Sequence, residues 1–312
     1  MQIVHDLNHA CPASQSHVTV GVFDGVHRGH QRLIGGMVEA AHSLQNLAVA
    51  VTFDPHPAVV LGHEPLPLLT TLEERTRLLA ALGLDVLAVL PFTPAMAHTP
   101  ATDFVESLIR HLHMVELWGG SDFALGHRRE GSIPFLRRLG KERGFAVRVV
   151  EPLMLDGHAV NSSRVRAALQ EGDVGQAMKC LGRPYRLTGV VVRGRGVGQS
   201  MGVPTANISP PPTRLIPANG VYACVAYTGH LHSHRAVTNI GTRPTFADKR
   251  LVVEAHLLDF EAHLYDQVLT LDFIARLRDE LAFPTLNALV GQIQEDITRA
   301  RDILTNYSPA SA

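Results

Sequence analysis

One segment near the start of the chain, residues 18–30 (VTVGVFDGVHRGH), restricts the fold more than any other part of the sequence. Val18, Val20 and Val22 lie on a short apolar run, and a glycine-rich turn separates this run from a periodic segment that begins near Gln31. The pattern predicts a buried strand that runs into a helix. Glycines let a ligand approach the backbone closely, and the unpaired N–H groups of a helix N-terminus attract an anion. The joint between strand and helix therefore predicts a phosphate site.

His27 and His30 stand three residues apart across Gly29, so both side chains would face an anion bound at this joint. Two other interpretations stay open from these residues alone. A His-x-x-His pair at a turn is compatible with a metal site, and it is also compatible with two surface histidines among the 18 of the chain.

Length and charge narrow the class of protein. A chain of 312 residues is long enough for about two domains with buried cores, and 46% hydrophobic with 18% charged residues indicates a globular protein. The 28 basic residues are balanced by 29 acidic ones, so the chain has no broad positive field for DNA or RNA. We therefore expect no nucleic-acid partner.

The cysteines and the first residues indicate a cytoplasmic protein. Cys11, Cys180 and Cys224 are odd in number and far apart, which argues against a disulfide framework and against a cysteine zinc site. The segment MQIVHDLNHA lacks the basic and then apolar pattern of a signal peptide, and no apolar run approaches about 18 residues. We expect reduced thiols, a cytoplasmic location and no membrane segment.

Apolar runs and helical periodicity alternate through the first half of the chain. The runs at 46–53 and 84–92 are apolar on both faces, as in parallel strands that helices cover. Repeated units of strand and helix predict a twisted parallel sheet with right-handed crossovers, which is an α/β fold of the Rossmann type. The expected strands are 18–22, 46–53, 84–92, 114–118 and 146–150, and the expected helices are 31–44, 71–82 with Thr70 or Thr71 as N-cap, 102–113 and 133–143.

Polar motifs follow three of the predicted strands directly. They are the His27/His30 pair, Asp54-Pro-His56-Pro and Gly120-Ser-Asp122-Phe. Ligands of such sheets bind beyond the carboxyl ends of the strands, so we expect all three motifs at one edge of the sheet. Trp118 and Phe123 flank the last motif, where they either belong to the core or stack on a flat ring.

A further helix opens at residues 161–166 (NSSRVR). Ser162 or Ser163 suits the N-cap of this helix, which is the purely structural interpretation. Arg164 and Arg166 add two planar cations beside hydroxyl groups and a helix N-terminus, and this combination suits the oxygens of a triphosphate.

The pattern changes after a helix at 174–180. Short strands with frequent turns follow from residues 182–185 (GRPY) onward, which predicts an antiparallel barrel or sandwich, and a helix at 286–304 comes last. Residues 194–198 (GRGVG) resemble a dinucleotide loop only in spacing, because no helix follows them, and the sequence has no P-loop motif. The expected strands of this part are 187–194, 220–227, 234–241, 251–259 and 267–277.

Two motifs in this part carry oxygen donors. In PTAN, residues 204–207, Thr205 and Asn207 place a hydroxyl and an amide oxygen two residues apart, which suits Mg²⁺, although an ordinary turn contains the same residue types. Glu254 stands between Val253 and Ala255 on an apolar strand, where an acid is either a general base or a surface residue.

Three histidines alternate at 230, 232 and 234 and could face one side of a strand as a metal site. Gly229 and Ser233 indicate the tip of a hairpin instead. We therefore expect His230, His232 and His234 to be solvated.

Spaced motifs from about residue 18 to residue 301 resemble the bacterial bifunctional riboflavin kinase and FAD synthetase family. GVFDGVHRGH resembles the nucleotide-binding HxGH element, and VTFDPHP (51–57) and NSSRVR are similar to segments of the FAD synthetases. GRGVGQSMGVPTANI, GVY (220–222), NIGTRPT (239–245), VEAH (253–256) and RDE (278–280) are similar to the riboflavin kinase domain. Asn161, Leu125 and the pair Leu281-Ala282 depart from the family pattern.

This resemblance implies an FMN adenylyltransferase domain over residues 1–182 and a riboflavin kinase domain over residues 183–312. It implies Glu254 as the general base of the kinase, Thr205 and Asn207 at its metal ion, and His27 and His30 as catalytic residues of the adenylyltransferase. The implied ATP-binding residues of the first domain are Gly21, Phe23, Asp24, Gly25, His27, His30, Asp122, Asn161, Ser162, Ser163, Arg164 and Arg166. The implied ATP- and flavin-binding residues of the second are Gly194, Gly196, Gly202, Pro204, Thr205, Asn207, Tyr222, Asn239, Arg278 and Glu280.

The implied chemistry has two steps. Riboflavin loses a hydroxyl proton to Glu254 as it attacks the γ-phosphate of ATP, with Mg²⁺ and loop N–H groups stabilising the charge, and FMN results. The phosphate of FMN then attacks the α-phosphorus of ATP and releases pyrophosphate, with His27 and His30 stabilising charge and no side-chain nucleophile. ATP, riboflavin and FMN are the implied partners, and Mg²⁺ is the implied cofactor.

Two alternatives to this function stay open. One is a kinase whose adenylyl site is weakened or has another specificity, since Asn161 and Leu125 depart from the pattern. The other is a flavin-binding or regulatory protein without catalysis, which would bind flavin but not turn it over.

Overall fold

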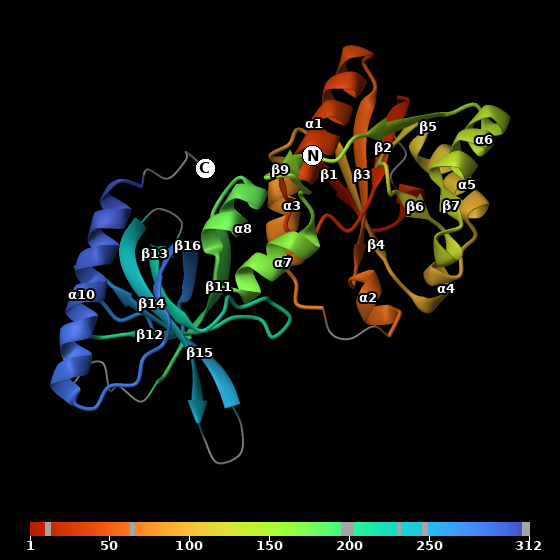
Figure 1. Ribbon diagram of the computed structural model, residues 1–312. Coiled ribbons are helices and arrows are strands. Elements are labelled where there is room, and N and C mark those ends of the chain that lie inside the picture. Colours follow the sequence, from red (N-terminus) through yellow and green to blue (C-terminus); the bar gives the residue numbers. More distant parts are fainter. Residues whose placement is uncertain (10–13, 63–65, 195–202, 230–231, 245–248, 308–312) are drawn as a thin grey trace. The chain divides into compact units, whose positions relative to one another are not determined.

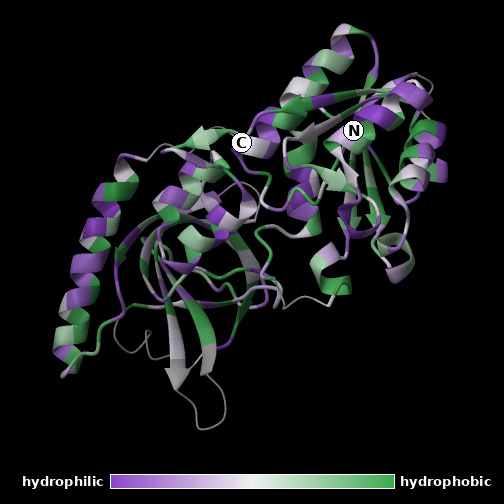
Figure 2. Ribbon diagram, turned by 45° about the vertical axis from the view of Figure 1, so that its right-hand side comes forward, coloured by the Kyte–Doolittle hydropathy of each residue, from purple (hydrophilic) through white to green (hydrophobic). Residues whose placement is uncertain are grey.

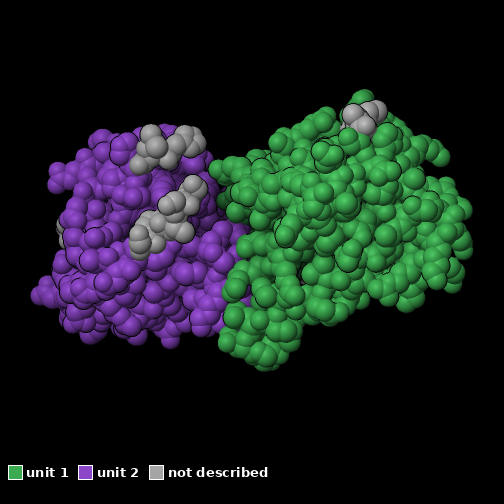
Figure 3. Space-filling model, turned by 90° about the horizontal axis from the view of Figure 1, so that it is seen from above, with its two compact units in different colours: residues 1–162 green, residues 163–312 purple. Residues whose placement is uncertain are grey.

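The computed structural model describes residues 1–9, 14–62, 66–194, 203–229, 232–244 and 249–307. The chain divides into two compact units, Met1–Ser162 and Ser163–Ala312, which Figure 3 shows in different colours. Each unit has its own sheet and its own core. Figure 1 labels the helices and strands of both.

A six-stranded parallel sheet forms the centre of the first unit, as the alternating pattern predicts. Its central strands are buried on both faces, which is why they are almost continuously apolar. In spatial order the strands are β1 (Gln2–Val4), β4 (Val86–Pro91), β3 (Leu47–Asp54), β2 (Ser16–Val20), β5 (Met114–Gly120) and β8 (Ala146–Val150).

Helices cover both faces of this sheet. α1 (Arg28–Ser43) and α3 (Leu72–Ala80) contribute Ile34, Met37 and Leu79 to the core of one face. α5 (Ala101–Leu112) and α6 (Ile133–Arg143) contribute to the core of the other face, where Leu108 and Leu136 are fully buried. The unit is therefore a three-layer α/β fold.

The strand order reverses at β2. The chain passes from β2 to β3 and β4 on one side, and then returns to place β5 and β8 on the other side. Loops that leave the carboxyl ends of β2 and β5 therefore diverge, and this is the place where open α/β sheets bind ligands. The segments that follow β2, β3 and β5 are those that hold the three polar motifs.

Most predicted elements of the first unit are present, with shifts at their ends. α6 and β8 have the predicted bounds, whereas α1 begins at Arg28, three residues before the predicted start. The sequence did not predict β1, because three residues carry too little periodicity. Other short elements that it did not predict are η1 (Leu7–His9), α2 (Pro57–Val60), α4 (Pro94–Ala97), η2 (His127–Arg129), and the hairpins β6 (Ala124–Leu125) with β7 (Gly131–Ser132) and β9 (Met154–Leu155) with β10 (His158–Ala159).

A closed antiparallel barrel forms the centre of the second unit, so of the two predicted architectures the barrel is correct. The order around the barrel is β11 (Tyr185–Val192), β12 (Ala206–Ser209), β15 (Lys249–Leu257), β14 (His232–Pro244), β13 (Gly220–Thr228) and β16 (Val268–Arg278). β12 is a strand that the sequence analysis did not predict, because its four residues follow a segment rich in glycine and proline.

Among the described residues of this unit, three helices accompany the barrel. α7 (Ser162–Gln170) begins at the division between the units, and α8 (Val174–Leu181) follows it and lies against β16 and β11. α10 (Leu286–Thr305) carries hydrophobic and hydrophilic residues in alternating bands (Figure 2). Its Ala300 and Leu304 pack on Val221 of β13 and Ile274 of β16, so α10 covers the outer face of these strands.

Candidate active sites

The loop after β2 has an unusual backbone. Phe23, Gly25 and Val26 all have positive φ angles, at 53°, 79° and 39°, and all three residues are buried. A side chain at position 21 would collide with the Phe23 ring at 2.9 Å from its Cβ, so only glycine fits there. The loop thus folds back tightly between the strand and α1.

Asp24 holds this loop in place. Its buried carboxylate accepts hydrogen bonds from the backbone N–H groups of Leu69 and Thr70 and from the Thr70 hydroxyl, each at 3.0 Å. The Thr70 hydroxyl also accepts from the Gly25 N–H at 3.0 Å, and Ser162 donates from its hydroxyl to the Asp24 carbonyl at 2.8 Å. Asp24 therefore organises the loop rather than presenting its carboxylate to a ligand.

His27 and His30 lie together as the sequence predicts. Their rings stack with centroids 3.6 Å apart, and His27 is the N-cap of α1, since its Nδ1 accepts from the His30 N–H at 3.3 Å. Burial and then the neighbouring His27 hold the pKa of His30 well below its usual value of 6.5. Among the described residues, the buried Nδ1 of His30 has no hydrogen-bond partner, and no group of three metal-ligating side chains occurs.

Arg75 is a residue of this site that the sequence analysis missed. Its buried guanidinium donates to the carbonyl of Val22 after β2 at 2.9 Å and to the carbonyl of Phe53 in β3 at 3.2 Å. Burial lowers the pKa of Arg75, while the carboxylates of Asp24, Asp54 and Glu73 raise it. On α3 this arginine is one of several polar positions, so helical periodicity alone does not distinguish it.

The motif after β5 lies at the same carboxyl edge of the sheet. Asp122 is exposed, and its carbonyl accepts from the Arg129 guanidinium at 2.7 Å. Trp118 is buried beside α1, and Phe123 packs on the core of the other face of the sheet. Both aromatic residues are therefore part of the hydrophobic core, which is one of the two roles that the sequence left open. Leu125, which departs from the family pattern, is buried in that same core.

The residues of the NSSRVR segment divide between the units. Asn161 is exposed, and Ser162 makes the bond to the Asp24 carbonyl already described. Ser163 is exposed, Arg164 is half-buried and Arg166 is buried, all three on α7 in the second unit.

A row of polar residues crosses three neighbouring strands of the barrel. Glu254 of β15 pairs directly with Asn207 of β12 on one side and with Asn239 of β14 on the other. Residues that pair directly share one face of a sheet, so these three side chains lie side by side. Val253 and Ala255, which flank Glu254, are buried on the opposite face, so the row lies on the outer face of the barrel.

The segment before β12 is tied to this row. His256, two residues after Glu254 on β15, donates from Nδ1 to the Pro204 carbonyl at 2.7 Å and so holds the residue next to Thr205. The side chain of Asn207 fills the space beside Gly194, where a Cβ would lie 2.7 Å from the Asn207 Cγ. Gly196 and Gly202 lie outside the described residues.

Tyr222, Arg278 and Glu280 were also predicted to bind ATP or flavin in the kinase, and they lie outside the row of Asn207, Glu254 and Asn239. Tyr222 is fully buried, its hydroxyl donates to the Ala218 carbonyl at 2.5 Å, and burial raises its pKa to about 12. It pairs with Thr238 and not with Asn239, so it faces the barrel interior. Glu280 accepts from the Asn219 side chain at 3.0 Å and lies against Gly241, while Arg278 binds Asp296 of α10.

Among the described residues, the histidines of the β13–β14 hairpin belong to no group of three metal-ligating side chains. His232 is exposed, and His234 shares a hydrogen bond of 3.2 Å with the Thr228 hydroxyl and contacts the Phe260 ring. His230 lies outside the described residues.

Two family models match separate parts of the chain. Residues 11–164 match the FAD synthetase family, and residues 181–304 match the riboflavin kinase family. A bifunctional riboflavin kinase/FMN adenylyltransferase of Pseudomonas fluorescens is 37% identical and covers 96% of this chain and 97% of its own length. Proteins of the same name from Escherichia coli and Bacillus subtilis are each 34% identical, covering 98% and 94% of this chain and equal shares of their own.

Solved structures contain the same fold. A Streptococcus pneumoniae protein described as a macrolide-efflux protein is 28% identical and superposes with a TM-score of 0.89, over 98% of this chain and 99% of its own.

In the part of the chain that the structure describes, no helix has the length and apolar character needed to cross a membrane.

Proposed function

The chain belongs to the bifunctional riboflavin kinase/FMN adenylyltransferase family, and from this premise we propose which of its residues carry each reaction. The enzyme phosphorylates riboflavin with ATP to give FMN, and it then adenylylates FMN with ATP to give FAD and pyrophosphate. Residues 11–164 match the FAD synthetase family and carry the adenylyltransferase, and residues 181–304 match the riboflavin kinase family and carry the kinase.

Glu254 is the general base of the kinase in this proposal. The observation that supports it is the row on the outer face, where Glu254 stands between the amide side chains of Asn207 and Asn239. Glu254 is half-buried, so it is open to a bound hydroxyl group. Its carboxylate accepts the proton of the riboflavin alcohol as the oxygen attacks the γ-phosphate of ATP.

Mg²⁺ accompanies ATP in this site. The donor set fits a hard cation, because Thr205 offers a hydroxyl and Asn207 an amide oxygen on one chain segment, and Glu254 offers a carboxylate on the neighbouring strand. When bound, the ion neutralises phosphate charge and orients the γ-phosphate. The His256 bond to the Pro204 carbonyl and the close contact of Asn207 with Gly194 fix the positions of the two neutral donors.

His27 and His30 stabilise charge in the adenylyl transfer. Because the low pKa of His30 leaves its imidazole neutral near pH 7, His30 acts as a hydrogen-bond donor and not as a cation. The N-terminus of α1, capped by His27, adds backbone N–H groups and a positive dipole end. The FMN phosphate itself is the nucleophile at the α-phosphorus of ATP.

The other residues have supporting roles in the proposal. Gly21, Phe23, Asp24 and Gly25 form the loop that cradles ATP in the adenylyltransferase, and Asp122, Asn161, Ser162, Ser163, Arg164 and Arg166 complete its ATP contacts. Gly194, Gly196, Gly202 and Pro204 approach ATP in the kinase, and Glu280 contacts the flavin. The polar group of Tyr222 binds Ala218, and that of Arg278 binds Asp296. In this proposal the two residues act on the substrates indirectly, by positioning the residues next to them. We also propose the functional boundary at 182/183 and a cytoplasmic location without nucleic-acid or membrane partners.

Product analysis with matched variants tests this assignment. We expect the full-length protein with riboflavin, ATP and Mg²⁺ to accumulate FMN and then FAD. Glu254→Gln should slow FMN formation by about 100-fold or more yet still convert added FMN to FAD, because only the kinase loses its base. His30→Ala should make FMN at the normal rate and stop there.

Exposed residues provide the controls. Glu261→Gln and His158→Ala, both on the surface, should leave both rates unchanged. FMN formation by Glu254→Gln at the wild-type rate would remove Glu254 from the proposal. A wild-type protein that stops at FMN would favour the weakened adenylyl site, and binding of flavin without any product would favour a non-catalytic protein.

A further inference from the structure

We propose that Asp296 of α10 is a positioning residue of the riboflavin kinase, which acts through Arg278 on the segment 279–283 beside the active site. This inference rests on the kinase site proposed above. Asp296 is 5% exposed, although it lies on a helix whose polar side otherwise faces solvent. Burial of a charged carboxylate is costly unless a specific partner stabilises its charge.

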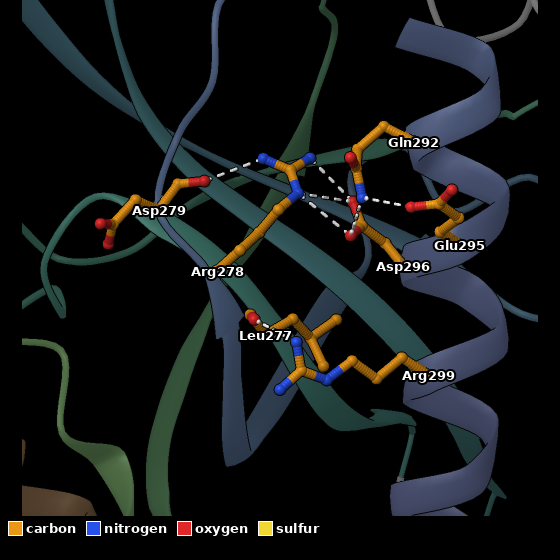
Figure 4. A network of polar contacts seen from close by, with 7 residues as sticks. All are labelled: Leu277, Arg278, Asp279, Gln292, Glu295, Asp296 and Arg299. Carbon is orange, nitrogen blue, oxygen red and sulfur yellow. Dashed lines mark hydrogen bonds and ion pairs between the residues drawn. The ribbon is translucent and has the colours of Figure 1, made fainter. Parts of the chain in front are cut away.

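That partner is Arg278, at the end of β16. Its guanidinium donates from Nε to both carboxylate oxygens of Asp296, at 3.0 and 3.1 Å, and from Nη2 to one of them at 2.7 Å (Figure 4). Gln292, one turn earlier on α10, donates to the same carboxylate at 3.3 Å. The pair is well shielded from solvent, because the Arg278 side chain is only 17% exposed.

Arg278 also organises the chain that follows it. Its Nη1 donates to the Asp279 carbonyl at 2.8 Å, and the guanidinium lies 5.7 Å from the centroid of the Phe283 ring. The Arg278 side chain thus forms a hydrogen bond with the first residue of segment 279–283 and contacts the ring of its last residue. With Asp296 removed, Arg278 would lose three of its hydrogen bonds, and the segment would lose the anchor that fixes it.

The segment reaches the catalytic face through Glu280. The Asn219 amide donates to Glu280 at 3.0 Å and to the Thr242 hydroxyl at 2.9 Å, and Glu280 lies so close to Gly241 that a Cβ there would be 2.9 Å from its Cδ. Gly241 is two residues after Asn239 on β14. A continuous set of contacts therefore runs from α10 to the strand that neighbours Glu254.

Successive strand pairings also connect the two ends of this set. Arg278 pairs with Val221, Val221 pairs with Asn239, and Asn239 pairs with Glu254. β16 and β15 are three places apart in the closed six-stranded barrel, so they lie on opposite sides of it, and Arg278 does not reach Glu254 across the sheet. The link to the kinase site runs instead through segment 279–283, whose Glu280 lies against Gly241, two residues after Asn239 on the strand that neighbours Glu254.

Asp296→Asn in the full-length enzyme tests the proposal. We expect KM for riboflavin to rise about tenfold with kcat within about threefold of wild type, because the flavin site loses its shape while Glu254 keeps its neighbours. FAD formation from added FMN should not change. Amide hydrogen exchange should speed up in residues 279–285 but not in β15.

Arg301→Gln is the matched control. Arg301 also lies on α10 and binds Asp259 with two hydrogen bonds of 2.8 Å, but this pair is exposed and lies outside segment 279–283. We expect KM for riboflavin to stay within about twofold of wild type. An equal rise of KM in both variants would mean that α10 acts only as a structural support, and it would overturn the proposal.

Arg278→Lys covers the case in which Asp296→Asn does not fold. Lysine keeps a charge beside Asp296 but cannot bond the carboxylate and the Asp279 carbonyl with a planar fork, so KM for riboflavin should rise again. An unchanged KM in Arg278→Lys or in a folded Asp296→Asn would overturn the proposal. The activity of Glu254→Gln, measured in the same series, reports separately on the proposed base.

Discussion

Contacts made by a few residues set the shape of both candidate sites. In the first unit, Asp24 and Arg75 bind backbone groups and so hold the loop on which His27 and His30 stand. In the second, His256 and Gly194 fix the PTAN segment beside Glu254. The residues that touch substrate are therefore fewer than the residues on which the geometry depends.

Two buried histidines predict a loss of stability in mild acid. Burial lowers the pKa of His17, against the opposing effect of Glu116, and burial also holds the pKa of His30 well below 6.5. Both groups are neutral in the folded protein and take up a proton on unfolding once the pH falls below about 6.5, so the folded state loses stability as the pH falls. We expect the unfolding midpoint in urea to drop between pH 7.5 and pH 5.5.

His30→Gln separates this effect from other causes. The variant should lose less stability over the same pH interval, because one of the two groups is gone. His5→Gln, at an exposed position, should lose as much as wild type. If both variants follow the wild-type curve, His30 does not contribute to the pH dependence.

At the scale of whole elements, the start of α3 links local helix chemistry to the first site. Thr71 and Glu74 form a capping box, in which the Thr71 hydroxyl accepts from the Glu74 N–H at 3.2 Å and Glu74 accepts from the Thr71 N–H at 2.9 Å. Thr70, the residue before the cap, binds Asp24. The cap therefore also supports the loop after β2.

Thr71→Ala should lower the free energy of unfolding by about 1 kcal/mol, since one N–H of the first turn loses its partner. Thr71→Ser keeps the hydroxyl and should remain within a few tenths of a kcal/mol of wild type. Denaturation in urea measures both variants. Equal stability of the alanine and serine variants would show that the cap contributes nothing.

Sequence alone predicts the regular elements and the local motifs, because both depend on short spacings. The parallel sheet, the barrel, α10 and the contact between His27 and His30 follow from periodicity and turn residues. Contacts between distant segments do not, and so Arg75 and the pairing of Arg278 with Asp296 were missed. β12 was missed for a different reason, since four residues after a glycine-rich segment give no periodic signal.

At the scale of the whole molecule, each unit has cores of its own. The two clusters around the parallel sheet contain residues of the first unit alone, and the cluster under α10 contains residues of the second alone. Residues that share one continuous core unfold together in a single cooperative transition. The two units therefore have separate sources of stability.

Calorimetry should resolve two unfolding transitions. Asp24→Ala removes the acceptor of several buried hydrogen bonds and should lower only the transition of the first unit, by about 2–4 kcal/mol. Leu271→Ala, at a fully buried barrel position, should lower only the other transition, by about 2–5 kcal/mol. A single transition that moves with either variant would show that the units unfold together.

The row of Asn207, Glu254 and Asn239 also limits how the chain length can change during evolution. Successive residues of a strand face opposite sides, so the loss or gain of one residue within β15 would turn Glu254 into the barrel and Val253 or Ala255 outward. Insertions and deletions in this unit are therefore tolerated in the connections between strands and not within β12, β14 or β15. The face that carries Glu254 therefore requires a fixed residue count within these strands, a requirement that the loops between them do not share.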